Sequence, residues 1–205
     1  MELKEAIEKR ASVRSFTDEP VPEEHIKEII RLAGLAPSIN NSQPWKFTVV
    51  LKKEVLQTMA TTVIKSIDEI PSNQSRLAKN IKSQVAWYSS FFEEAPVVLA
   101  LATEPCESVL SKGVSLSNVE INEIRNHPDI QGTGACIQNL LLAAVDQGYA
   151  ACWLSGPLFA KEKLEKLLHI EEPWKLTTFV ALGKAKTTAK PRGKKNVADE
   201  ITWIR

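Results

Sequence analysis

The sequence predicts an α+β domain in which one central sheet is covered by helices. Helical and strand patterns interleave along the 205 residues, but too few of them form clean strand–helix–strand units for a doubly wound sheet. Residues 132–147 form a helix that is apolar on nearly all sides, which indicates burial on most sides. This length suits one domain. We therefore expect a single domain over residues 1–205, with residues 184–205 as a C-terminal extension.

Apolar residues at helical spacing predict the helices of the first half of the chain, over residues 3–10, 22–35, 55–70 and 75–92. Pro22 suits the first turn of the second helix, and Pro37 ends it. Trp87, Tyr88, Phe91 and Phe92 cluster near the end of the fourth helix, as core or as a subunit contact. Strands are expected over residues 45–51 and 96–103, of which the second is an apolar run typical of a buried strand.

The second half begins with residues 104–129, which have weak periodicity and one short helix near 118–126. A connection of this length is expected to cover something or to carry specificity. The buried helix over 132–147 ends at Gly148. A strand over 150–154, a helix over 160–168 and a strand over 176–183 complete the domain. The basic tail ends in Ile201-Thr202-Trp203-Ile204, so we expect it to dock on a surface.

Composition limits the function classes. The formal net charge is +1, so neither a broad basic surface nor a nucleic-acid partner is expected. No apolar run approaches the ~18 residues of a membrane span, so no membrane partner is expected. The three cysteines form no CxxC pair, and reduced thiols in a cytoplasmic protein are the simplest interpretation. The three histidines show no ligand spacing, and no metal site is proposed.

The stretch Arg10-Ala11-Ser12-Val13-Arg14 is the first candidate binding site. Alternate side chains of an extended segment share one face, so Arg10, Ser12 and Arg14 would converge on one point. Guanidinium forks and a hydroxyl suit a phosphate. The alternative is a helix end, with Arg10 at the negative pole of the first helix and Arg14 in solvent.

The loop over residues 37–45 is bracketed by prolines and rich in short polar side chains. It is either a turn that satisfies its own hydrogen bonds or a loop that presents donors and acceptors to a ligand. The chain has no P-loop, GxGxxG, nucleophile elbow or paired-carboxylate motif. Phosphate ligands without a catalytic side chain indicate a cofactor that carries the chemistry.

The sequence resembles the nitroreductase family of FMN-dependent oxidoreductases. The matching segments, in order, are residues 10–16 (RASVRSF), 36–47 (APSINNSQPWKF), 134–144 (GACIQNLLLAA) and 152–156 (CWLSG). The resemblance implies a mostly antiparallel sheet and an intertwined homodimer, with FMN at the subunit interface and the C-terminal extension crossing to the partner.

The family also implies an activity. Electrons would pass from NAD(P)H, a transient co-substrate, through FMN in a ping-pong cycle to nitroaromatic, quinone or similar electron-poor acceptors. No catalytic side chain is implied, because the flavin carries the chemistry. The alternatives within the fold are reductive dehalogenation, enoyl-type reduction and flavin cleavage. A further alternative is a flavin-binding or sensing protein with low turnover.

The resemblance also assigns cofactor-binding residues. It places Arg10, Ser12 and Arg14 on the flavin phosphate or ribityl chain. It places Ser38, Asn41 and Gln43 in a loop beside the flavin, with some contacts to the partner's FMN. Ser155 and Gly156 match the turn whose backbone approaches the ring. Arg192 and Lys194 match a second basic pair for the phosphate, with Lys195 as a rival.

Overall fold

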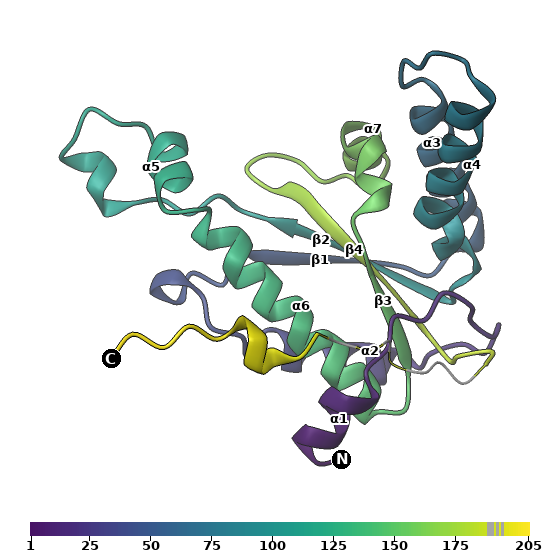
Figure 1. Cartoon of the computed structure of the whole chain (residues 1–205), viewed down its shortest axis with the longest axis horizontal. Coiled ribbons are helices and arrows are strands. Elements are labelled where there is room, and N and C mark those ends of the chain that lie inside the picture. Colours follow the sequence, from purple (N-terminus) through teal and green to yellow (C-terminus); the bar gives the residue numbers. More distant parts are fainter. Residues whose placement is uncertain (188–190, 192, 194) are drawn as a thin grey trace.

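The computed structural model describes residues 1–187, 191, 193 and 195–205. Within these residues it has a four-stranded sheet in the order β1-β2-β4-β3, with every neighbouring pair antiparallel (Figure 1). The strands are β1 (Trp45–Val50), β2 (Val97–Thr103), β3 (Ala150–Leu154) and β4 (Lys175–Gly183). The predicted α+β class, with one antiparallel sheet flanked by helices, is confirmed.

Helices cover both faces of this sheet (Figure 1). One face packs against α2 (Glu23–Ala33) and α6 (Pro128–Asp146), and α1 (Leu3–Lys9) contacts α6. The other face packs against α3 (Lys53–Asp68) and α7 (Lys161–Leu167). Helix α4 (Arg76–Ser90) lies beside α3. The sheet therefore separates two hydrophobic cores.

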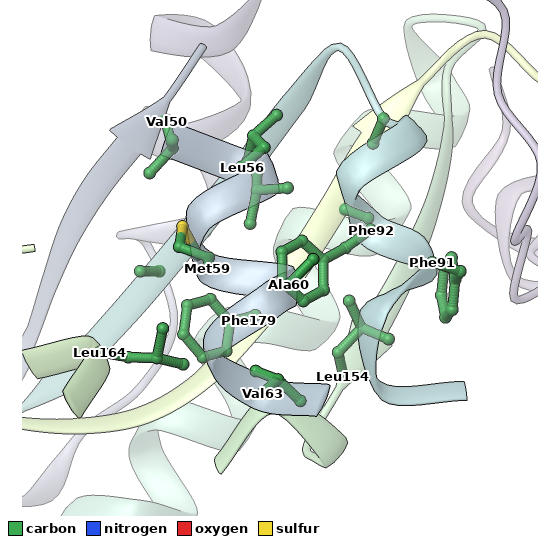
Figure 2. Packing of buried hydrophobic residues seen from close by; sticks show 14 of the residues in the cluster. Val50, Leu56, Met59, Ala60, Val63, Phe91, Phe92, Leu154, Leu164 and Phe179 are labelled. Carbon is green, nitrogen blue, oxygen red and sulfur yellow. The ribbon is translucent and has the colours of Figure 1, made fainter. Parts of the chain in front are cut away.

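Figure 2 shows the core on the α3 side of the sheet. Phe92 and Phe179 stack with ring centroids 6.3 Å apart and an interplanar angle of 4°. Met59 of α3 and Leu164 of α7 are fully buried around them. Offset aromatic pairs at this separation add to the stabilisation from buried apolar area. This core holds β3 and β4 rigidly where the candidate site lies.

Helix α6 is longer than expected, because it begins at Pro128 rather than at residue 132. The two glycines at 132 and 134 disfavour helix, but proline in the first turn starts the helix upstream of them. The prediction of a buried helix is confirmed for most of its length, and Gly148 follows it with a φ of +74°. A left-handed residue of this kind suits glycine after a helix C-terminus.

The segment between β2 and α6 projects from the body of the domain (Figure 1). It contains a 3-10 turn, η3 (Val109–Lys112), and helix α5 (Asn118–Ile124), which begins with a Ser117–Glu120 capping box. Val109, Val119 and Ile124 are exposed. This segment was expected to cover something. These three side chains do not pack on either hydrophobic core of this chain.

The C-terminal extension leaves the sheet beside the N-terminal segment. Lys186 N–H donates to Ser15 O at 3.0 Å, and Thr17 N–H donates to Lys184 O at 2.9 Å. Further along, η5 (Val197–Glu200) is followed by Trp203 and Ile204, whose residues are 73% and 96% exposed. Among the described residues, no helix is long and apolar enough to cross a membrane.

Candidate functional site

The segment from Arg10 to Arg14 lies along the edge strand β3. Ser12 forms a parallel bridge with Ala151, and Val13 N–H donates to Ala151 O at 3.1 Å. Val13 is buried, whereas Ser12 is exposed and both arginines are half-buried. Pairing with the strand extends the chain, and an extended chain alternates its side chains. The local geometry predicted for this stretch is therefore present.

Arg10, Ser12 and Arg14, here called the cationic cluster, lie on the stretch that pairs with Ala151 of β3, next to Cys152. Burial raises the pKa of the Cys152 thiol, and Arg14, a hydrogen bond with Ser12, and Arg10 each act in the opposite direction. These directions agree with the pairing of this stretch beside β3. Arg10 also ends α1, where its N–H donates to Ala6 O at 3.0 Å. Arg10 is therefore also the residue that ends α1, as the alternative interpretation predicts.

The two guanidiniums retain their charge for a ligand. Among the described residues, neither Arg10 nor Arg14 forms an ion pair with a carboxylate. The Arg14 guanidinium carbon lies 5.7 Å from the centroid of the Tyr88 ring on α4. A cation over an aromatic face is attracted to it without being neutralised. The cluster is thus a positively charged, preorganised position that suits an anion.

A pocket of about 530 Å³ adjoins this cluster. It lies where the N-terminal half of α6 faces the end of β3 and the start of β4, and every side chain that lines it is uncharged. Ser12 and Ser155 both line it, so it connects the cationic cluster with the turn after β3. Its wall includes Trp153, which is 46% exposed and whose Nε1–H donates to Thr178 Oγ1 at 2.7 Å. The pocket suits a flat, uncharged group.

The turn at Ser155 and Gly156 begins η4 (Gly156–Ala160). A Cβ atom at Gly156 would lie 2.3 Å from Ser89 Oγ and 2.9 Å from Ser89 Cβ, on α4. Both distances are shorter than any relaxed contact. The absence of a side chain at Gly156 therefore lets this turn and α4 pack together, and the exposed Ser155 is held at the mouth of the pocket.

The polar loop contains η1 (Ile39–Asn41), and part of it satisfies itself. Gln43 N–H donates to Ser38 Oγ at 2.9 Å, and Gln43 Nε2 donates to Asn41 Oδ1 at 3.4 Å. Asn40, Asn41 and Gln43 have φ values of 50°, 53° and 47°. Left-handed conformations in residues other than glycine cost energy and cluster at functional sites. Both interpretations of the loop therefore find support.

This loop lies against the N-terminal half of α6. Ser38 lies against Gly132 of α6, and a Cβ at Gly132 would be 3.5 Å from it. Ser38, Asn41 and Gln43 are not among the residues that line the pocket. Arg192 and Lys194 lie outside the described residues. Lys195 is exposed, and its Nζ lies 3.0 Å from a Glu200 carboxylate oxygen.

Sequence reasoning missed several residues that line or support the pocket. Cys152 and Trp153 belong to a recognised motif, but neither was assigned a role. Thr133, Thr177 and Thr178 fall within the predicted helix over 132–147 and the predicted strand over 176–183, and all three line the pocket. Adjacent threonines in an otherwise apolar strand were the available signal, because buried hydroxyls need partners.

Known proteins resemble this chain along most of its length. The model of the nitroreductase family matches residues 7–184. An iodotyrosine deiodinase of Hydra vulgaris is 27% identical over 197 residues, which are 94% of this chain and 68% of that protein. A putative NAD(P)H nitroreductase, MhqN, of Bacillus subtilis strain 168 is 22% identical over 195 residues, covering 95% of this chain and 94% of that protein.

Solved structures resemble it as well. A BluB-like flavoprotein from Clostridium difficile 630 has a TM-score of 0.90 and 29% identity, with all of both chains covered. A nitroreductase with bound FMN from Desulfitobacterium hafniense DCB-2 has a TM-score of 0.76 and 24% identity, again over the whole of both chains. At 24% identity, the likeness to the second structure shows a shared fold alone.

Proposed function

Because the chain belongs to the nitroreductase family, we propose that it is an FMN-dependent oxidoreductase that passes electrons from NAD(P)H to nitroaromatic, quinone or similar electron-poor acceptors in a ping-pong cycle. One observation carries the proposal. Ser12, which alternates with Arg10 and Arg14 along the stretch paired with β3, lines a pocket whose other lining side chains are all uncharged. This arrangement separates an anionic end of a ligand from a neutral, flat end.

The residues present fit FMN. A phosphate monoester carries about two negative charges near neutral pH, and two guanidiniums with a hydroxyl can neutralise and bond it. The turn at Ser155 and Gly156 and the wall at Trp153 would hold the ring. When bound, the flavin supplies the hydride and electron chemistry. The chain's own task is then to bind, orient and partly enclose it.

We expect purified protein to be yellow with bound FMN and to oxidise NADH or NADPH when a quinone or a nitroaromatic is supplied. Varying both substrates should give the parallel double-reciprocal lines of a ping-pong cycle. The reaction without acceptor is the control for slow oxidation by oxygen. Colourless protein that takes up no added FMN would contradict the proposal. Tight FMN binding without turnover would favour a flavin-binding or sensing role.

We further propose that the single domain, with its extension over residues 184–205, forms a homodimer. Leu3 and Ile7 of α1 are exposed in the single chain, as are Trp203 and Ile204 near its end. Ser38, Asn41 and Gln43 of the polar loop do not line the pocket of their own chain. In a homodimer this loop would serve the partner's flavin, and the extension would cross to the partner.

Light scattering is expected to give twice the 22.8 kDa mass of one chain. Deleting residues 201–205 removes Trp203 and Ile204, so the truncated chain should dissociate at concentrations where the full chain stays dimeric. A truncation at Arg205 alone is the matched control and should leave the mass unchanged. A monomeric full chain that still binds FMN tightly would contradict the proposal that each flavin site is shared by two chains.

Reductive dehalogenation is the second candidate within the fold. Two observations favour it: iodotyrosine deiodinases of rat and Hydra vulgaris match nearly all of this chain, at 26% and 27% identity. Iodide release from an iodinated tyrosine by the reduced protein, without quinone or nitroaromatic turnover, would favour this candidate. Loss of the flavin spectrum in the presence of oxygen would instead favour flavin cleavage. The cytoplasmic location stays a prediction of the cysteine usage.

A further inference from the structure

Strand β4 contains an irregularity beside the pocket. Leu101 of β2 lies opposite Thr178, whereas the next residue, Ala102, lies opposite Leu176. Thr177 is therefore an extra residue on β4. Successive side chains of a regular strand point to opposite faces, but a bulge re-aims one of them. As a result, Thr177 and Thr178 both line the pocket although they are neighbours in sequence.

Thr177 is anchored by a chain of hydroxyls. Its Oγ1 donates to Thr103 Oγ1 at 2.8 Å or to Lys175 O at 3.1 Å, and Thr103 Oγ1 lies 2.9 Å from Thr133 Oγ1 on α6. Thr103 and Thr133 are buried, at 2% and 0% exposure. A threonine hydroxyl has one proton and two lone pairs. Because both acceptors of the Thr177 proton belong to the protein, the half-buried oxygen keeps acceptor capacity for a ligand.

The Thr178 hydroxyl and the Trp153 indole N–H also donate to acceptors within the protein. The Thr178 hydroxyl donates to Leu154 O at 2.7 Å, and it accepts from Trp153 Nε1–H at 2.7 Å. The indole has no other donor. On this wall of the pocket, Thr177, Thr178 and Trp153 therefore offer hydrogen-bond acceptors and an aromatic surface, while their donors are already used.

A wall of this kind suits a flat, neutral ligand that brings its own N–H group. We propose that Thr177 is a binding residue that accepts a hydrogen bond from the imide N–H of the flavin ring, with Thr103 and Thr133 positioning its hydroxyl. The proposal rests on the proposed function, since it takes the pocket to be the flavin site. Beyond that function, the proposal identifies Thr177 as the residue that recognises the imide edge of the flavin ring.

The test compares FMN with N3-methyl-FMN, which lacks the imide N–H, by fluorescence titration. The wild-type chain should bind FMN about fivefold more tightly, the scale of one neutral hydrogen bond. Thr177→Val should lose this preference, and Thr177→Ser should keep it. Thr48→Val, in the half-buried part of β1, is the control and should keep it too. Melting temperatures report whether each variant folds.

Every result of these titrations either supports the proposed role of Thr177 or overturns it. A Thr177→Val variant that discriminates between the two flavins as the wild type does overturns the proposal, as does a wild type that binds FMN without preference. Thr177→Ala also removes the hydroxyl and should lose the preference, so it tests the proposal where the valine variant fails to fold. A wild-type chain that binds neither flavin overturns this inference together with the proposed function. Normal FMN binding and turnover with no N3 preference overturns this inference alone.

Discussion

Arg14→Ala is expected to weaken FMN binding by about 1.5–3 kcal/mol, the scale of a hydrogen bond to a charged group, or roughly 10- to 150-fold in dissociation constant. The guanidinium belongs to the cationic cluster and has no carboxylate partner among the described residues. Its guanidinium carbon lies 5.7 Å from the centroid of the Tyr88 ring, which attracts the cation without neutralising it. Titration of the apoprotein with FMN measures the effect.

Two variants sharpen this test. Arg14→Lys keeps the charge but loses the planar fork, so we expect an intermediate loss of affinity. Arg76→Ala removes an exposed arginine at the start of α4 and should leave the affinity unchanged. FMN affinity that is unaffected by Arg14→Ala would remove Arg14 from the site. Arg10→Ala is measured in the same titration. A weaker FMN affinity would show that Arg10 binds the phosphate, and an unchanged affinity would show that it only ends α1.

Gly156→Ala is expected to destabilise the fold by about 1–3 kcal/mol, the usual cost of overpacking. The added methyl would meet Ser89 Cβ at 2.9 Å and Ser89 Cα at 3.1 Å, so rotating the hydroxyl alone cannot relieve the contact. Helix α4 and the turn after β3 must then separate, which moves Ser155 at the pocket. Denaturant unfolding measures the loss of stability, and a weaker FMN affinity should accompany it.

A second substitution, at Ser89, should relieve the clash that Gly156→Ala creates. Ser89→Gly removes the two nearest contacts, so Gly156→Ala should cost less in that background than in the wild type. The single variant Ser89→Gly supplies the baseline, because glycine inside a helix costs about 1 kcal/mol by itself. Gly113→Ala is the matched control, since its nearest contact would be 4.0 Å away. Equal costs of Gly156→Ala in both backgrounds would contradict this account of the turn.

The aromatic cluster at the end of α4 shows what a local pattern leaves open. Its residues were expected to be core or subunit contact, and the structure divides them. Phe91 and Phe92 are buried, whereas Trp87 and Tyr88 are 56% and 45% exposed. Spacing along a helix shows which side chains share a face. Which face meets the core depends on α3 and the sheet, which come from distant parts of the chain.

The amino-acid sequence by itself determined the order of helices and strands and the α+β class, because these depend on local periodicity and on residue type. Only the tertiary structure decided that the Arg10–Arg14 stretch is extended beside β3 and that Thr177 and Thr178 share one pocket. Thr103 and Thr177 are 74 residues apart in sequence. Their contact depends on the register between β2 and β4, and a one-residue bulge in that register reverses which face a side chain meets.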